Sequence, residues 1–267
     1  MSQTVPLQNK LAALESILLA NAPLIIAYSG GVDSTCLLAF AHRTLGDRMQ
    51  GIIADSPSLP RQAFADALAL AREMGAPVEV IQTGEMENPE YASNPLNRCY
   101  FCKAELFANM DTLARERHFT AIAYGENADD PPQHRPGSQA AKEFAVLAPL
   151  RLAGLTKADV RELSRTLGLP TADAPAQPCL SSRIPHGTPV TREALAMVEA
   201  GEALVRSLGF RVLRVRHLVD PSGLRARVQI APEEMGRLGD LQPQIEAGLL
   251  EVGYTSVEID PQGYRSL

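Results

Sequence analysis

The heptapeptide Ser29-Gly30-Gly31-Val32-Asp33-Ser34-Thr35 constrains this chain more than any other feature. The uncharged run before it, residues 24–28, predicts a buried parallel strand, and apolar residues at helical spacing over 36–45 predict a helix after it. In a strand-turn-helix of this kind, backbone N–H groups and the helix N-terminus converge where an oxyanion binds. The segment therefore predicts a phosphate site within an α/β fold.

The alternation of strands and helices continues along the chain. Further strands are expected at 49–54, 78–81 and 121–124, with helices at 61–74, 102–117 and 157–167. This order is typical of a doubly wound parallel sheet with helices on both faces. The rhythm changes near residue 188, after which a helix at 191–208, paired strands at 211–218 and 224–230, a helix at 232–250 and a strand at 255–259 are expected. We therefore predict a domain over residues 1–188 and a smaller C-terminal α+β domain over 189–267.

Composition limits the classes of partner. The formal net charge is −6 and the pI is about 5.5, so the whole chain does not attract nucleic-acid phosphates and a polynucleotide substrate is disfavoured. The sequence shows no transmembrane helix and no secretory signal, which predicts a cytoplasmic protein with no membrane partner. In that compartment thiols stay reduced, so the four cysteines are not read as a disulfide framework.

The residue types of the heptapeptide indicate a magnesium nucleotide. Gly30 and Gly31 permit close backbone approach, and the hydroxyls of Ser34 and Thr35 can donate to phosphate oxygens. The carboxylate of Asp33 would repel phosphate unless it held a divalent cation. The segment lacks the lysine of a G-x-x-x-x-G-K-[ST] site and the spacing of a G-x-G-x-x-G dinucleotide site.

The segment resembles the S-G-G-x-D-S-T signature of the ATP pyrophosphatase-loop (PP-loop) family, whose sheet is of the adenine nucleotide alpha hydrolase type. The resemblance implies that the loop, from Ser29 to Thr35, binds the pyrophosphate part of ATP, with Asp33 as a catalytic residue. It also implies that Asp55 and Ser56 lie where the family holds adenine, although an ordinary strand-end turn explains them nearly as well. The segment from Gly125 to Asp130 looks like the family's G-x-N-x-D-D, so Gly125, Asn127 and Asp130 are expected to contribute to the nucleotide and its Mg²⁺.

Three cysteines form a second candidate site. Cys99 and Cys102 stand as a C-x-x-C pair at the start of a predicted helix, and Cys179 follows on a separate proline-rich loop. Three thiolates suit an iron-sulfur cluster with one open iron, or zinc with a further ligand. A redox-active dithiol and three unrelated structural thiols are the alternatives on pattern alone. Cys36 lies on the apolar face of a predicted helix and is expected to be buried and structural.

With both groups placed, nearly the whole chain resembles the LarE family, the ATP-dependent sulfur transferases that make the organic part of the nickel-pincer cofactor of lactate racemase. The matching segments are the PP-loop, Arg135-Pro136-Gly137, Gly154-Leu155-Thr156-Lys157, the run from Pro178 to Pro185, Leu208-Gly209-Phe210 and Arg214-Val215-Arg216-His217. The resemblance implies adenylation of the carboxylates of a pyridinium dicarboxylate mononucleotide and their conversion to thiocarboxylates. Cys179 matches the sulfur-handling cysteine, and the three-cysteine pattern resembles the branch that uses a [4Fe-4S] cluster. A homo-oligomer, a hexamer by family resemblance, is also implied.

The substrate's phosphate requires a cationic receptor. Arg183, Arg214 and Arg216 are candidates because guanidinium binds phosphate bidentately, and Ser182 can add a hydroxyl donor. Glu202 and Arg214 match functionally important positions of the family, with a solvated glutamate and a strand-edge arginine as the alternative. One segment departs from the family, because its A-R-I-E reads Ala226-Arg227-Val228-Gln229 here.

Two other activities share the PP-loop. A tRNA thiolase would use the same adenylation and cysteines but should have a basic RNA-binding surface, against which the acidic balance argues. An amidating ligase would use ammonia, and its cysteines would be incidental. The residues leave open which compound supplies the sulfur.

Overall fold

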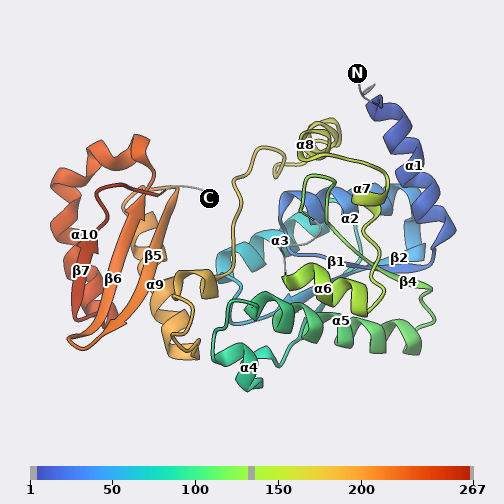
Figure 1. Cartoon of the computed structure of the whole chain (residues 1–267). Helices are drawn as coiled ribbons and strands as arrows, with labels where there is room; N and C mark the ends of the chain where they lie inside the picture. Colours follow the sequence, from blue (N-terminus) through green and yellow to red (C-terminus); the bar gives the residue numbers. More distant parts are fainter. Residues whose placement is uncertain (1–4, 132–135, 265–267) are drawn as a thin grey trace. The chain divides into compact units, whose positions relative to one another are not determined.

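The computed structural model describes residues 5–131 and 136–264, which form two compact units (Figure 1). Unit 1 comprises Met1–Glu85 and Asn97–Gln177, and unit 2 comprises Met86–Leu96 and Pro178–Leu267. Unit 1 ends at Gln177, and unit 2 also includes the earlier segment Met86–Leu96. The predicted division at residue 188 into two functional domains stays a prediction.

Unit 1 is built on a parallel sheet in the order β3-β2-β1-β4. Its strands are β1 (Leu24–Ala27), β2 (Met49–Asp55), β3 (Val78–Gln82) and β4 (Ala121–Tyr124). Leu24 pairs in register with Met49 of β2 on one side and with Ala121 of β4 on the other. All four strands coincide with predicted apolar runs to within a residue or two, because strands covered on both faces read as continuous hydrophobic segments.

Helices cover both faces of this sheet (Figure 1). Alternate residues of β1 serve the two sides: Leu24 and Ile26 belong to one hydrophobic core, and Ile25 belongs to the other. The first core includes residues of α1 (Leu7–Ala20), α2 (Val32–Leu45), α3 (Arg61–Glu73) and α8 (Lys157–Thr166), and the second includes residues of α5 (Arg98–Glu116) and α6 (Pro136–Glu143). The predicted doubly wound α/β fold is confirmed. Unit 1 also contains the short helices η1 (Gly46–Arg48) and α7 (Pro149–Leu152).

The strand order creates a switch point between β1 and β4. The chain steps outward from β1 to β2 and β3, and then returns to place β4 on the opposite side of β1. Loops that leave the carboxyl ends of such neighbouring strands diverge and open a crevice, which is where open α/β sheets bind ligands. The heptapeptide follows β1 and the segment from Gly125 to Asp130 follows β4, so both predicted nucleotide segments lie at this point.

Unit 2 contains a three-stranded sheet in the order β5-β6-β7, packed against two helices. The strands β5 (Leu213–Asp220) and β6 (Gly223–Ile230) form an antiparallel hairpin, and β7 (Ser256–Ile259) pairs parallel to β6. The helices are α9 (Arg192–Ser207) and α10 (Leu238–Val252), with the short turns η3 (Leu180–Arg183) and η4 (Pro232–Arg237). This confirms the predicted smaller α+β unit.

The two stretches that resisted assignment have different outcomes. Residues 83–98 contain η2 (Glu85–Glu87) and α4 (Pro89–Ala92), and Ala92 O and Asn94 O accept hydrogen bonds from Val190 N and Gly187 N at 2.8 and 2.9 Å. Of the stretch 127–139, residues 132–135 lie outside the described part, and Arg135 of the Arg135-Pro136-Gly137 segment lies with them. In the described ranges, no helix has both the length and the apolar character needed to cross a membrane.

Candidate active site

The PP-loop turns sharply at Gly30. Gly30 has φ +73°, in the left-handed region, and a Cβ there would lie 2.7 Å from the Cβ of Ala67. A side chain is therefore excluded both by backbone conformation and by the packing of α3. Gly31 has φ −73° and directly precedes α2, so the loop delivers its backbone to the first turn of that helix.

Hydroxyl groups hold this loop together. Ser34 Oγ accepts a hydrogen bond from Ser29 N at 3.2 Å, lies 3.0 Å from Ser29 Oγ and donates to Gly31 O at 3.1 Å. Ser34 is 7% exposed and Thr35 is fully buried. The side chain of Ser34 thus shapes the loop, and the predicted contacts of Ser34 and Thr35 with phosphate stay predictions.

Asp33 is the charged centre of the loop. Its Oδ2 accepts from Lys157 Nζ at 2.6 Å, and its Oδ1 accepts from Asn127 Nδ2 at 3.2 Å. The Asp33 side chain keeps 21% of its exposure and Lys157 keeps 38%, so solvent or a ligand reaches both. Lys157 is a cation beside the PP-loop that our site prediction did not include. Its only sequence signal was its place in Gly154-Leu155-Thr156-Lys157, because the pairing joins residues 124 positions apart.

The segment after β4 lies against the PP-loop and is tied to the start of α8. A Cβ on Gly125 would lie 2.7 Å from Ser34 N, so only glycine lets the end of β4 approach the loop backbone this closely. Asp130 Oδ2 accepts from Asn127 N at 3.1 Å, which closes the turn. Asp129 Oδ2 accepts from Lys157 N at 2.8 Å and ties the same turn to the start of α8. The predicted group of Asp33, Gly125, Asn127 and Asp130 therefore lies together around the switch point.

This group has the donors that a magnesium nucleotide needs. Mg²⁺ is usually held by one or two carboxylates together with substrate phosphates, and the Asp33 and Asp130 carboxylates can supply that number. Backbone N–H groups at the start of α2 and the ammonium of Lys157 suit the phosphates. Among the described residues, no three His, Cys, Asp or Glu side chains form a metal-binding group by themselves.

The predicted adenine position has internal partners. Asp55 accepts from Arg61 and, at 3.0 Å, from Gln82, and these hydrogen bonds hold the pKa of its carboxyl below the usual range. Ser56 is buried, bonds to Ser58 at 2.8 Å and donates to Glu85. The role of Asp55 and Ser56 at adenine stays a prediction.

The cysteines fall into distinct environments. Cys99 is exposed and Cys102 is half-buried, one turn apart at the start of α5, which begins at Arg98 and not at residue 102 as expected. Cys179 is half-buried and belongs to unit 2. Cys36 is fully buried, and burial raises the pKa of its thiol to about 11, in keeping with the structural role expected for it.

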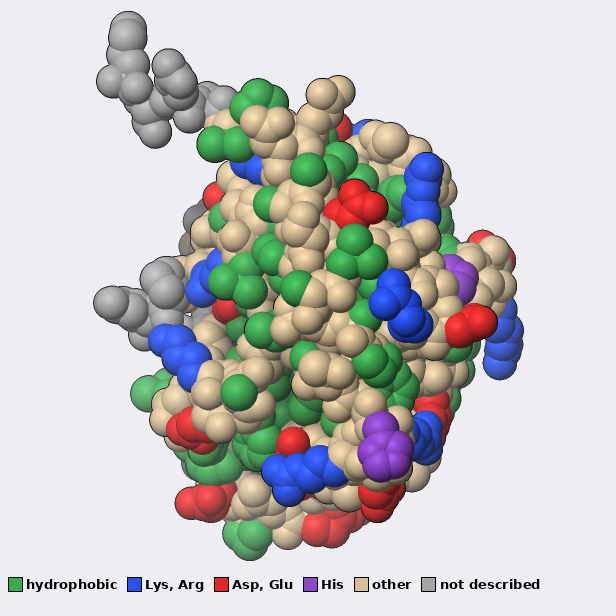
Figure 2. Space-filling model, turned by 90° about the vertical axis from the view of Figure 1, so that its right-hand side faces the viewer, with side chains coloured by type: hydrophobic (Ala, Val, Ile, Leu, Met, Phe, Trp, Pro, Cys, Tyr) green, Lys and Arg blue, Asp and Glu red, His purple; other side chains and the backbone are tan. Residues whose placement is uncertain are grey.

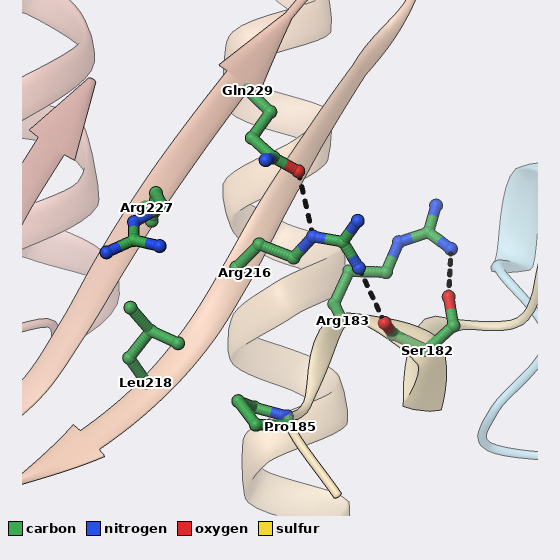
Figure 3. A pocket seen from close by; sticks show the side chains of 7 residues that line it. All are labelled: Ser182, Arg183, Pro185, Arg216, Leu218, Arg227 and Gln229. Atoms are coloured by element: carbon green, nitrogen blue, oxygen red, sulfur yellow. Dashed lines mark hydrogen bonds between the residues drawn. The ribbon is translucent and has the colours of Figure 1, made fainter. Parts of the chain in front are cut away.

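A pocket in unit 2 gathers cationic and polar side chains (Figure 3). Its volume of about 250 Å³ is below the roughly 300–1,000 Å³ of sites that hold a whole ligand, so it suits one part of a mononucleotide. Arg216 donates through Nε to Gln229 Oε1 at 2.9 Å and through Nη1 to Ser182 O at 2.7 Å. The lining residues are Ser182, Arg183, Pro185, Arg216, Leu218, Arg227 and Gln229.

Arg214 and Arg216 place positive charge in this region, and both side chains are partly buried. Burial, and then repulsion from Arg183, lower the pKa values of Arg214 and Arg216 below the ordinary arginine value. Arg214 is 7% exposed, stacks on the Tyr264 ring at 4.7 Å and donates to Leu213 O at 2.7 Å. Arginines that repel one another in this way are stabilised by an anion. The five residues predicted to bind substrate, Ser182, Arg183, Glu202, Arg214 and Arg216, all lie in unit 2.

The chain is similar to known proteins over nearly its whole length. No protein-family model matches the chain. The chain is 31% identical over 97% of its length to the pyridinium-3,5-bisthiocarboxylic acid mononucleotide synthase of Lactiplantibacillus plantarum, of which it covers 93%. It is 42% identical over 91% of its length to an uncharacterized protein of Synechocystis, of which it covers 90%.

A more distant similarity covers one part of the chain. The GMP synthase of Thermomicrobium roseum is 30% identical over 68% of this chain, which spans 38% of that enzyme. This partial similarity supports the assignment of the chain to the PP-loop superfamily. Because the chain is 31% identical to the mononucleotide synthase over 97% of its length, it belongs to the LarE family, as the sequence resemblance predicted.

Proposed function

We propose that this protein is an ATP-dependent sulfur transferase that converts the carboxylates of a pyridinium dicarboxylate mononucleotide to thiocarboxylates for the nickel-pincer cofactor. The observation that carries the proposal is the similarity over 97% of the chain to a synthase of the bisthiocarboxylic acid mononucleotide. The phosphate-binding geometry around Gly30 and Asp33 supports the same reaction.

The first step is adenylation. A carboxylate oxygen of the substrate attacks the α-phosphorus of ATP, the bond to the β-phosphate oxygen breaks, and pyrophosphate leaves. The backbone of Gly30 and Gly31 and the ammonium of Lys157 stabilise the charge on pyrophosphate. Asp33 and Asp130 would hold Mg²⁺, which would supply positive charge to neutralise the phosphates. Carboxylates are poor electrophiles, and adenylation supplies the leaving group that they lack.

The second step is sulfur transfer. A sulfur nucleophile attacks the acyl carbon, the bond from that carbon to the AMP oxygen breaks, and AMP leaves with that oxygen. Cys179 is the sulfur-handling residue, and Cys99, Cys102 and Cys179 are the proposed ligands of a [4Fe-4S] cluster. Three thiolates leave one iron open, and such a cluster supplies a site for sulfide.

The substrate's phosphate binds in the pocket of unit 2. Arg216, which lines the pocket, provides the cationic receptor, Arg214 adds positive charge beside it, and Ser182 provides a hydroxyl donor. A cytoplasmic homohexamer is part of the proposal, carried by family resemblance.

The rival activities are a tRNA thiolase and an amidating ligase. A tRNA enzyme needs an extended basic surface, and on the face drawn in Figure 2 Lys and Arg are interspersed with Asp and Glu. Incubation with ATP, Mg²⁺ and the dicarboxylate mononucleotide under anaerobic conditions should release pyrophosphate and AMP and yield a thiocarboxylate. An amide in the presence of ammonia, or activity on tRNA alone, would contradict the proposal.

A further inference from the structure

Arg183 is buried beside the residue that handles sulfur. Its side chain is 2% exposed, and each guanidinium nitrogen has a partner within unit 2. Nη1 donates to Pro178 O at 2.6 Å, to Cys179 O at 3.0 Å and to Ser182 Oγ at 2.9 Å (Figure 3 shows the last of these). The guanidinium thus contacts the carbonyl oxygen of Pro178, directly before Cys179, and the carbonyl oxygen of Cys179 itself.

Glu202 fixes the direction of this guanidinium. The carboxylate is fully buried on α9 and accepts from Arg183 Nε at 2.7 Å and from Arg183 Nη2 at 3.2 Å. It also accepts from Arg206 Nη2 at 2.7 Å and from Val215 N at 3.3 Å, which anchors it to β5. Two parallel N–H···O bonds between charged groups set orientation as well as energy. The planar guanidinium binds the carboxylate through Nε and Nη2 and binds the Cys179 loop through Nη1.

Other hydrogen bonds also support the chain that follows Cys179, among them one between Ser181 Oγ and Tyr91 Oη at 2.8 Å. The turn η3 follows it, and Ser182 N donates to Cys179 O at 3.0 Å. Arg216 holds Ser182 O at 2.7 Å from the pocket side. Burial would raise the pKa of Glu202, but the hydrogen bonds and charges of Arg183 and Arg206 outweigh burial and lower it, so the carboxylate stays ionised.

We propose that Arg183 is a positioning residue: Glu202 aims its guanidinium so that it holds the backbone at Cys179 and thereby fixes the cysteine for sulfur transfer. The direct phosphate contact predicted for Arg183, which also lines the pocket, stays a prediction. The positioning role rests on the proposed function of Cys179. Adenylation does not use the Cys179 side chain, so loss of the contact should slow sulfur transfer more than adenylation.

The experiment compares Arg183→Lys with the double variant Arg183→Gln/Glu202→Gln, which leaves no buried charge unpaired if the single variant folds poorly. Arg206→Gln is the matched control, because Arg206 also pairs with Glu202 but has no contact with the Cys179 loop among its hydrogen bonds. Hydrogen exchange of the Ser182 amide should rise about tenfold in the Arg183 variants and stay unchanged in the control, since a lost contact of about 1.4 kcal/mol is tenfold in an equilibrium.

Activity provides the second readout. Thiocarboxylate formation should fall about 100-fold in the Arg183 variants, as expected for a misplaced reacting group. Pyrophosphate release should fall much less than thiocarboxylate formation, because the contact with the Cys179 backbone acts on the sulfur-transfer step. A raised KM with a parallel loss of pyrophosphate release would make Arg183 a substrate ligand and overturn the proposal. Unchanged amide exchange would also overturn it, and this readout decides even if the wild-type protein forms no thiocarboxylate.

Discussion

The pair of Asp33 and Lys157 joins the PP-loop to the start of α8. The carboxylate receives Lys157 at 2.6 Å and Asn127 at 3.2 Å, so three segments distant in sequence meet at one side chain. The Lys157 ammonium offsets the charge of Asp33 beside the proposed phosphate site. The pair therefore couples loop geometry to the charge that ATP encounters.

Replacing Asp33 with asparagine should lower substrate-dependent pyrophosphate release at least about 100-fold, because a proposed Mg²⁺ ligand at the leaving pyrophosphate is lost. The assay is pyrophosphate release with ATP and the dicarboxylate mononucleotide. Asp66→Asn is the control, since Asp66 lies on α3 and accepts only from Gln62 among its hydrogen bonds. Full activity of Asp33→Asn would reject the role assigned to this residue.

Glu202 makes the stability of unit 2 depend on pH. Its pKa is lowered from 4.5 in the folded protein, so the stability it contributes is complete above pH 4.5 and is lost as pH falls through the lower, folded-state pKa. Glu202→Gln should lower the free energy of unfolding by about 1.5–3 kcal/mol at neutral pH, as for hydrogen bonds to charged groups. Chemical denaturation at several pH values measures this difference, which should shrink in acid. A difference that is constant with pH would contradict the assignment.

At this scale the sequence predicted residue types better than contacts. The heptapeptide was enough to predict Gly30 and Asp33 as parts of the phosphate loop, because the signal lies within one turn. Lys157 was not assigned, because its partner is 124 residues away. Arg183 was predicted as a phosphate ligand from its charge, whereas its burial and its contacts with Glu202 and Cys179 arise only from the packing of η3 against α9.

Among the elements, the junction of β1 and β4 determines where the nucleotide can bind. Gly30 and Gly125 both occupy places where a Cβ would meet neighbouring atoms at 2.7 Å. The strands and helices themselves were predictable, because apolar runs and helical spacing are local signals. The start of α5 was not, since the four residues from Arg98 to Phe101 are too few to show a helical period.

Gly30→Ala should lower stability by about 1–2 kcal/mol from the left-handed backbone alone, with an added clash against Ala67. Gly31→Ala is the matched control, because its φ is −73° and its Cβ would make only an ordinary contact at 3.6 Å from Ser29 Oγ. Thermal denaturation of both variants measures the difference. Equal stability of the two variants would show that the Gly30 turn does not require glycine.

At the scale of the whole molecule, the three proposed cluster ligands come from segments that lie far apart in the sequence. Cys99 and Cys102 belong to unit 1 and Cys179 belongs to unit 2. The sequence indicated three ligands by residue type, but a site assembled from separate loops cannot be derived from local pattern. The division into a large α/β unit and a smaller α+β unit was predictable, whereas the membership of Met86–Leu96 in unit 2 depends on hydrogen bonds with residues beyond 180.

The iron content of the isolated protein tests the proposed iron-sulfur cluster. Anaerobically isolated protein should contain iron and sulfide, and Cys99→Ala should lose most of both because a thiolate ligand is removed. Cys36→Ala is the control, since Cys36 is buried in the core of unit 1 and should leave iron unchanged. Equal iron in the wild-type protein and Cys99→Ala, or none in either, would defeat the cluster proposal.

The account as a whole depends on the conversion of a carboxylate to a thiocarboxylate at the expense of ATP. Mass spectrometry of the mononucleotide after anaerobic incubation with the protein, ATP and Mg²⁺ measures this directly. The account predicts replacement of a carboxylate oxygen by sulfur, with AMP and pyrophosphate formed in step. An unchanged mononucleotide, or an amide in place of the thiocarboxylate, would contradict it.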